Sequence, residues 1–207
     1  MCFALRLHMS AAPTQGGLTP ALGRMKISWR TLTRQQAHRH LLSELRGRVF
    51  HITSVENFLA IVRADMIKHN GDGTLKSNGK YNSYFKNRGC VSFCDFHNNV
   101  RPRKVREAAI RKYDIFGQGG GESFVFLFLT PNSYSKLIPW TRWKTEKALS
   151  EMVVPHLESG YPGAVPLAEI DEANFIHIPV TEEERHIREV LLAAMQKARS
   201  RGTQGAA

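Results

Sequence analysis

His51 and Thr53 stand one residue apart in the stretch VFHITS, where an expected strand meets an expected helix. Residues two apart in an extended chain point to the same side, so both side chains would face one ligand. An imidazole and a hydroxyl in this arrangement suit a ribose diol or an amide. The alternative is a core histidine with satisfied hydrogen bonds beside a threonine that caps the helix. Local sequence alone favours this structural interpretation.

A second group with possible chemistry is Cys90, Cys94 and His97, with the spacing C-x3-C-x2-H. Zinc needs about four ligands at fixed geometry. Residues four apart on a strand are about 13 Å apart, too far to bind one ion without a bend. His51 or His69 could complete a ligand set, but the spacing does not demand it. We expect two buried thiols and no metal site.

Two further chemistries have little sequence support. The segment GQGGGES, residues 117–123, has the glycine content of a phosphate loop. It precedes a strand pattern rather than a helix, so the helix N-terminus that binds phosphate is missing, and we interpret it as a turn. A nuclease using His51, His69 and His97 as acid and base would lack a carboxylate cluster to hold a metal.

The elements that must position these residues follow from periodicity and capping signals. We expect a helix over 33–47, capped by Thr33 and ended by Gly47, then a strand over 49–53. A second helix follows, with Ser54 as its cap. Its buried face is predicted to consist of Val55, Phe58, Leu59 and Val62.

Downstream, residues 69–89 read as a loop rich in glycine, asparagine and lysine. Further predicted elements are a strand in GCVSFCDF, a basic helix over 101–117, a buried strand in ESFVFLFL, strands within 145–155, 164–170 and 174–180, and a helix over 181–201. This order indicates an α+β fold rather than alternating βαβ units. We expect a disordered tail over 1–25, one domain over 26–200 and a tail over 201–207; Met1 and Met25 are both candidate starts.

Several short motifs, taken in order, resemble the ADP-ribosyltransferase superfamily. They are His51-Ile52-Thr53, a helix with Asn57 near its start, the strand GCVSFCDF, and Glu151 in SEMVVP. The later AVPLAEI is similar to a VPLxxI step that follows the catalytic glutamate in DarT-like, nucleic-acid-modifying toxins. The resemblance covers about residues 48 to 180.

This resemblance implies a split β-sheet core flanked by helices, and an enzyme that uses NAD as a substrate. The family cleaves the bond between nicotinamide and ribose and transfers ADP-ribose to an acceptor. A carboxylate, by resemblance Glu151, stabilises the oxocarbenium-like transition state. The implied NAD-binding residues are His51 at the adenosine-side ribose, Thr53 helping to hold the NAD and Asn57 lining the same pocket. Tyr84 would stack on nicotinamide (with Tyr81, Phe93 and Phe96 as alternatives), Arg88 would bind the diphosphate, and Ser92 matches the serine of the second-strand motif.

The sequence also departs from the family pattern. Leu149 stands where the arginine-directed branch carries the first glutamate of Glu-x-Glu, which disfavours arginine as the acceptor. The glycine that usually follows the first helix is replaced within RADMIK. Glu146 and Glu158 compete with Glu151 for the catalytic role; Glu151 is preferred because it begins the nearby apolar run.

The net charge of the chain indicates which kind of partner it binds. The 207 residues carry a formal charge of +11, which favours anionic partners and makes a nucleic acid the expected acceptor. A toxin with an antitoxin partner fits this pattern; a protein acceptor, or a non-catalytic nucleic-acid-binding module on the same fold, are the alternatives. Three cysteines and no long apolar run give neither a disulfide framework nor a membrane span, so we expect a cytoplasmic protein.

Overall fold

The structure is a computed structural model that describes residues 25–33, 36, 43–71, 83–97 and 123–179. Most of the expected helix at 33–47, the helices at 101–117 and 181–201, residues 1–24 of the first predicted tail and the whole second tail lie outside the described residues. Met25, predicted as the end of the disordered tail, is buried in the core. The strands are β1 (Lys26–Thr31), β2 (Val49–Ser54), β3 (Met66–Ile67), β4 (Cys90–Asp95), β5 (Ser123–Leu129), β6 (Ile138–Pro139), β7 (Glu158–Pro162), β8 (Val165–Pro166) and β9 (Ile170–His177). The helices are α2 (Val55–Ala64), α3 (Tyr84–Asn87), α5 (Thr141–Thr145) and the 3-10 turns η1 (Pro131–Lys136) and η2 (Leu167–Glu169).

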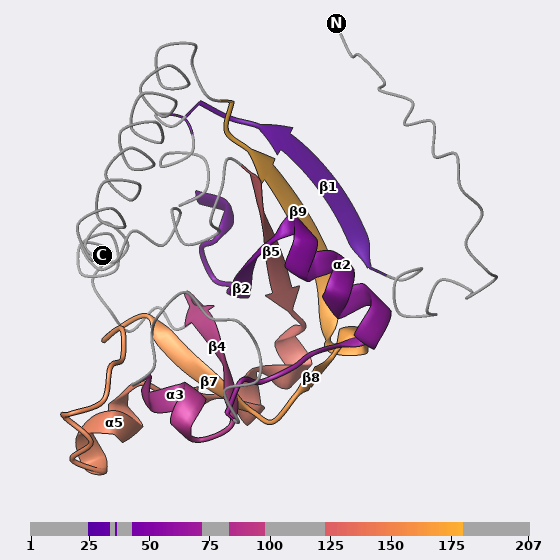
Figure 1. Cartoon of the computed structure of the whole chain (residues 1–207). Helices are drawn as coiled ribbons and strands as arrows, with labels where there is room; N and C mark the ends of the chain where they lie inside the picture. Colours follow the sequence, from indigo (N-terminus) through magenta and orange to yellow (C-terminus); the bar gives the residue numbers. More distant parts are fainter. Residues whose placement is uncertain (1–24, 34–35, 37–42, 72–82, 98–122, 180–207) are drawn as a thin grey trace, which may run out of the picture.

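A seven-stranded sheet with the order β1-β9-β5-β2-β4-β7-β6 forms the body of the described fold (Figure 1). Only the edge strand β1 runs parallel to its neighbour β9, and all other pairs in this sheet are antiparallel. The short strands β3 and β8 pair separately. A mostly antiparallel sheet with few helices is an α+β architecture, as the sequence predicted.

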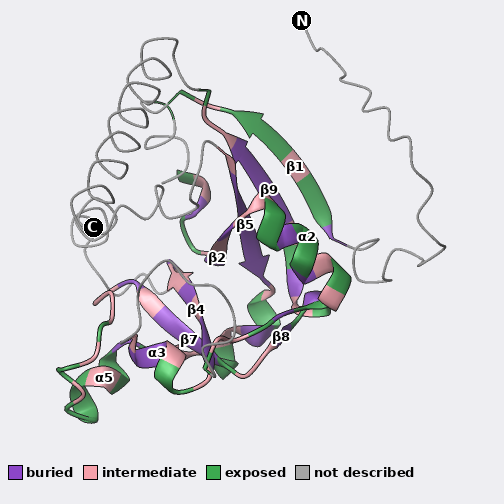
Figure 2. Ribbon diagram, in the orientation of Figure 1, coloured by how far each residue is buried: buried purple, intermediate pink, exposed green. Residues whose placement is uncertain are grey.

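The central strand β5 supplies hydrophobic side chains to both faces of the sheet. Val125 and Leu127 pack on the face that α2 covers, while Phe124 and Phe126 pack on the other. Such two-sided burial explains the continuous apolar run SFVFLFL. Figure 2 shows β5 as buried and the edge strand β1 as largely exposed.

Helix α2 begins and ends at residues with clear capping roles. The Ser54 side chain accepts a hydrogen bond from the backbone N–H of Asn57 at 3.2 Å, as expected for an N-cap. At the other end Asp65 adopts a left-handed conformation with φ 55°, and its N–H bonds to the carbonyls of the last turn. Phe58 and Ile61 are buried, whereas Leu59, predicted to be buried, is 50% exposed. Thr33 is also a cap, since its hydroxyl accepts from the N–H of Gln36 at 3.2 Å.

The ladder between β2 and β4 is short. It contains only the pairs Val49–Asp95 and Phe50–Cys94. By contrast, β2 pairs with β5 over five residues, and β4 pairs with β7 over five. The sheet therefore divides in its middle after Phe50, and the residues that follow on β2 no longer share a backbone ladder with β4.

The predicted strand within 145–155 is wrong. Helix α5 is followed there by turns and a bend, with Met152 in a single isolated bridge to Ser83. The chain then reverses at Pro155 and His156, whose φ of 68° is incompatible with a continuing strand. Strand β7 begins only at Glu158.

Two local features of this half of the sheet were also not predicted. Residues 83–88, expected as loop, contain the short helix α3. Phe85 of that helix packs directly against β7, so a Cβ on Gly160 would lie 2.1 Å from the Phe85 ring. Only glycine fits at this close approach. Within the described residues, no helix has the length and hydrophobicity to cross a membrane.

Candidate functional site

Ser92, in the middle of β4, connects two other polar residues at the point where the sheet divides. Its backbone carbonyl accepts a hydrogen bond from His51 Nδ1 on β2 at 2.9 Å. Its hydroxyl donates to Glu158 Oε1 at the start of β7 at 2.7 Å. His51, Ser92 and Glu158 thus form one connected cluster drawn from three neighbouring strands.

The contact with Ser92 fixes the tautomer of His51. A carbonyl can only accept, so the proton lies on Nδ1 and leaves Nε2 as a hydrogen-bond acceptor. Burial lowers the pKa of His51, and the Ser92 carbonyl opposes this effect to a smaller extent. The imidazole is therefore neutral at pH 7 and suits a ligand that donates a hydroxyl. Thr53 is buried two residues further along the same face of β2.

Glu158 is held through both carboxylate oxygens. Oε1 accepts from the Ser92 hydroxyl, and Oε2 accepts from the backbone N–H of Val154 at 2.7 Å. The donor from Val154 belongs to the turn that leads into β7, where the N–H of Leu157 also bonds to the Val154 carbonyl. A carboxylate fixed by two donors has a defined position and needs little reorganisation when charge develops nearby.

These residues flank the division of the sheet from both sides. His51 and Thr53 occupy alternate positions after Val49 along β2 and point to the same face of the sheet, the one that α2 covers. Ser92 and Glu158 point to the opposite face, as Cys94 does. The His51 ring reaches across to the β4 backbone where the ladder has ended. Its ring centroid also lies 5.8 Å from that of Phe93.

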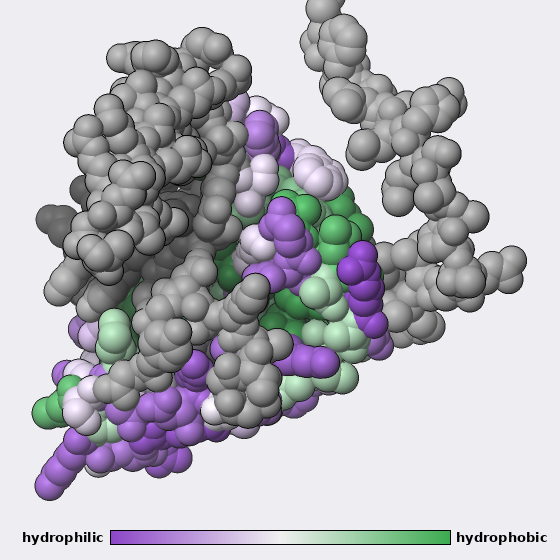
Figure 3. Space-filling view, in the orientation of Figure 1, coloured by the Kyte–Doolittle hydropathy of each residue, from purple (hydrophilic) through white to green (hydrophobic). Residues whose placement is uncertain are grey.

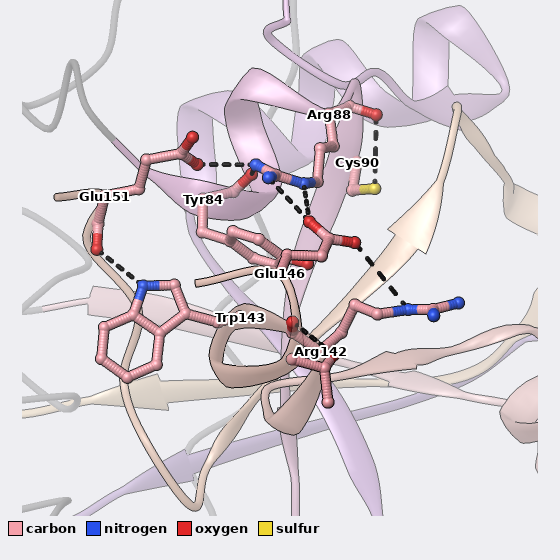
Figure 4. A network of polar contacts seen from close by, with 8 residues as sticks. Tyr84, Arg88, Cys90, Arg142, Trp143, Glu146 and Glu151 are labelled. Atoms are coloured by element: carbon pink, nitrogen blue, oxygen red, sulfur yellow. Dashed lines mark hydrogen bonds and ion pairs between the residues drawn. The ribbon is translucent and has the colours of Figure 1, made fainter. Parts of the chain in front are cut away.

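Arg88, predicted to bind a diphosphate, is instead engaged in the network of Figure 4. Its guanidinium contacts Glu146 at 2.8 Å and Glu151 at 2.6 Å. It also donates to the Tyr84 carbonyl at 3.1 Å and lies 3.8 Å from the centroid of the Tyr84 ring. These contacts use most of the N–H donors of the guanidinium and place one of its faces against the Tyr84 ring. In this arrangement Arg88 is not available to a diphosphate.

Tyr84 is not placed to stack on nicotinamide. Its side chain is fully buried, with Arg88 over the ring and Phe85 in an edge contact at 4.9 Å. Burial, with a smaller contribution from the nearby Glu146 carboxylate, raises the pKa of Tyr84 to about 12. Its role in this structure is to pack α3 against the network around Arg88.

Glu151 belongs to the same network rather than to the cluster around Ser92. Its carboxylate pairs with Arg88, and its backbone carbonyl accepts from Trp143 Nε1 at 3.0 Å. The predicted site residues are thus divided: His51, Thr53 and Ser92 lie at the centre of the sheet, and Tyr84, Arg88 and Glu151 lie together near α3 and α5. Asn57 is exposed on α2, where its backbone N–H completes the cap.

The sequence favours Glu151 over Glu158 because Glu151 begins an apolar run. Strand β7 reads ESGYP, which contains small residues where it pairs with β4 and contacts Phe85. A better signal was its position, since Glu158 opens the last strand before VPLAEI. The Val154 N–H that donates to Glu158 is a backbone group, so the residue types in the sequence could not predict this hydrogen bond.

The other candidate clusters have separate partners. Cys90 packs with Tyr84 and Phe85, whereas Cys94 packs against the core on the opposite end of β4. His97 Nδ1 lies 2.8 Å from Asp95, and His69 Nδ1 accepts from the N–H of Gly71. In the described part of the chain no group of three or more cysteine, histidine or acidic side chains could hold a metal ion.

Comparison of this chain with protein-family models, with curated proteins and with solved structures finds no match. The cluster around Ser92 therefore has to be interpreted from its own geometry.

Proposed function

We propose that the chain is an NAD-dependent mono-ADP-ribosyltransferase in which Glu158, rather than Glu151, supplies the catalytic carboxylate. The observation that carries the proposal is the double contact of Ser92, which joins His51 of the HIT motif to a glutamate at the front of a late strand. His51 and Ser92 come from two of the ordered motifs that resemble the transferase superfamily, and Glu158 lies between the motifs SEMVVP and AVPLAEI. The three residues also surround the place where the two halves of the sheet separate.

Each group in the cluster suits one part of this reaction. The bond between C1′ of the ribose and the nicotinamide nitrogen breaks, and nicotinamide leaves with the electron pair. The acceptor nucleophile then bonds to C1′ and loses its proton. Glu158, already held by Ser92 and Val154, would stabilise the positive charge on the ribose and could take that proton. A ribose held in the division between β2 and β4 would donate a hydroxyl to His51 Nε2 from one side and meet Glu158 from the other.

A nucleic acid is the proposed acceptor. The segment that leads from α5 into Glu158 exposes Arg142, Lys144 and Lys147, and the whole chain carries +11. Several cations on one segment bind successive phosphates. The basic residues of 101–117 lie outside the described part of the chain. An antitoxin partner and a cytoplasmic location remain predictions that accompany this function.

The test is turnover of NAD by the purified chain in the presence of single-stranded DNA, RNA or a protein mixture. Nicotinamide release would be measured by chromatography, and addition of ADP-ribose to the acceptor by mass spectrometry. We expect transfer to nucleic acid, a loss of about 10²-fold or more in Glu158→Gln, and a much smaller loss in Glu151→Gln. Glu56→Gln, an exposed carboxylate on α2, is the control for removal of one charge.

The outcomes separate the alternatives. No NAD turnover with any acceptor overturns the enzyme and leaves a nucleic-acid-binding module. Turnover that survives Glu158→Gln but not Glu151→Gln returns the carboxylate role to Glu151. Transfer only to protein corrects the acceptor and keeps the site.

A further inference from the structure

Strand β1 forms one edge of the seven-stranded sheet. On one side it pairs with β9 over six residues, from Lys26–Glu172 to Thr31–His177. No other described strand pairs with its outer edge. Among the described residues, the backbone N–H and C=O groups along that edge therefore have no strand partner, and such an edge is a template for another extended chain.

The side chains of β1 alternate between apolar and basic. Ile27 and Trp29 lie on the face that α2 covers, beside Ala173 and Phe175 of β9. Trp29 stacks on Phe175 with ring centroids 4.1 Å apart and an interplanar angle of 13°, yet it remains 68% exposed. Ile27 is 46% exposed. Figure 3 shows hydrophobic residues gathered over α2 beside this strand, where Leu59 is exposed as well.

The opposite face of β1 carries Lys26 and Arg30. The Lys26 ammonium is only at the limit of contact with Glu172, at 4.0 Å, and its side chain is 75% exposed. Arg30 pairs with Glu44, a contact that uses part of its five N–H donors. Both cations can therefore still meet an acidic side chain directly across the outer edge.

We propose that the outer edge of β1 binds an extended strand of a separate polypeptide in which acidic and apolar residues alternate. Backbone hydrogen bonds would add this strand to the sheet. Its apolar side chains would lie beside Ile27 and Trp29, and its acidic side chains would lie opposite Lys26 and Arg30. Directly opposed unlike charges stabilise such a pair, and like charges destabilise it.

Charge argues against two other occupants. A second copy of β1, paired antiparallel about Ser28, would place Lys26 opposite Arg30 of the other copy. Residues 1–25 of this chain contain no aspartate or glutamate, so they cannot supply the acidic positions. An acidic strand from another polypeptide matches both faces of β1.

The test uses the full chain and a fluorescein-labelled peptide of eight alternating Glu and Ile residues, read by fluorescence anisotropy. We expect saturable binding that weakens at least tenfold in Trp29→Ser and in the double variant Lys26→Glu, Arg30→Glu. Methylation of alternate peptide nitrogens should also abolish binding by removing the backbone donors. Leu149→Ser, which changes a 66% exposed apolar residue near α5, is the matched control and should bind as the parent does.

Three results would overturn the proposal. These are no binding of the Glu–Ile peptide, equal binding of a Lys–Ile peptide, and binding that Trp29→Ser leaves unchanged. Sedimentation of the chain alone gives an independent check, because a dimer that Trp29→Ser converts to monomer would assign the edge to a second copy. Since β1 contributes no residue to the cluster around Ser92, these results do not depend on the proposed enzyme activity.

Discussion

At the scale of single residues, two glutamates seven positions apart differ in what holds them. Glu158 accepts from a hydroxyl and a backbone N–H, which fix the orientation of its carboxylate. Glu151 is neutralised by Arg88, which also binds Glu146. The Ser92 hydroxyl links Glu158 to His51, whereas Glu151 lies in the separate network around Arg88. This placement favours Glu158 as the proposed reacting group.

His51 should make stability depend on pH. Burial lowers the pKa of His51 in the folded chain below its ordinary value of 6.5. At pH values between the folded-state pKa and 6.5, the unfolded chain therefore binds more protons than the folded chain. The free energy of unfolding should therefore fall as the pH drops through 6.5. His51→Gln cannot titrate and should lose less stability between pH 7.5 and 5.5 in urea unfolding. Equal losses in the parent and the variant would contradict a buried neutral imidazole.

Arg88 should act mainly on stability. Arg88→Ala removes two ion pairs and the contact with the Tyr84 ring, and we expect a loss of about 1–2 kcal/mol in the free energy of unfolding, given that the group is partly exposed. Arg142→Ala is the control, since it breaks a 3.9 Å contact with the same Glu146 and should cost less than about 0.5 kcal/mol. If Arg88→Ala instead raised the KM for NAD and left stability unchanged, the predicted diphosphate role would be correct.

At the scale of elements, α2 shows how the chain replaces a missing glycine. The sequence RADMIK has no glycine after the helix, and Asp65 adopts the left-handed conformation that glycine usually takes. A side chain in this conformation is strained, and an acidic one is also unfavourable at a helix C-terminus. The helix is held because the N–H of Asp65 still bonds to the last turn.

Asp65→Gly should therefore stabilise the protein by about 0.5–1 kcal/mol, measured by urea unfolding. Asp65→Ala separates the two causes, because it removes the charge but keeps a Cβ in the left-handed conformation. We expect it to recover only the smaller, electrostatic part. A destabilised Asp65→Gly would show that the aspartate side chain makes a contact worth more than the strain.

The elements that the sequence predicted are those with strong local signals. Val49–Ser54, Cys90–Asp95 and Ser123–Leu129 are apolar strands bounded by turn residues or caps, and Ser54 is a clear N-cap. Strand β1 was missed because pairing with β9, not its exposed sequence, makes it a strand. Strand β7 was missed because it consists of Glu, Ser, Gly, Tyr and Pro, and its pairing with β4 determines its structure.

The candidate site was predictable only in part for the same reason. His51, Thr53 and Ser92 lie on strands that the local sequence indicates. Tyr84, Arg88 and Glu151 depend on how α3 and the segment after α5 pack, and that packing is set by non-local contacts such as the bridge between Ser83 and Met152. Residue type suggested ligand contacts for Tyr84 and Arg88. In the structure Tyr84 is buried and Arg88 is ion-paired, and their ligand roles stay predictions.

At the scale of the whole molecule, the division of the sheet and the excess of positive charge correspond to different parts of the proposed function. The short ladder between β2 and β4 leaves His51 and Ser92 at the centre of the sheet. The exposed cations of α5 and the following turn lie on the segment that leads to Glu158. Under the proposed function, a polyanion bound along that segment would contact residues that directly precede Glu158 in the chain.

Binding of single-stranded DNA should therefore depend on salt and on this segment in particular. Each phosphate neutralised on a single strand contributes about 0.7 to the slope of log K against log salt concentration. The triple variant Arg142→Gln, Lys144→Gln, Lys147→Gln should reduce that slope by about 2, measured by anisotropy with a labelled 20-nucleotide strand between 50 and 200 mM salt. The matched variant Lys26→Gln, Arg63→Gln, Lys68→Gln removes the same charge from β1, α2 and the end of β3 and should reduce it far less. Equal reductions would mean that the DNA responds to net charge alone, and α5 would then have no special part in presenting an acceptor to Glu158.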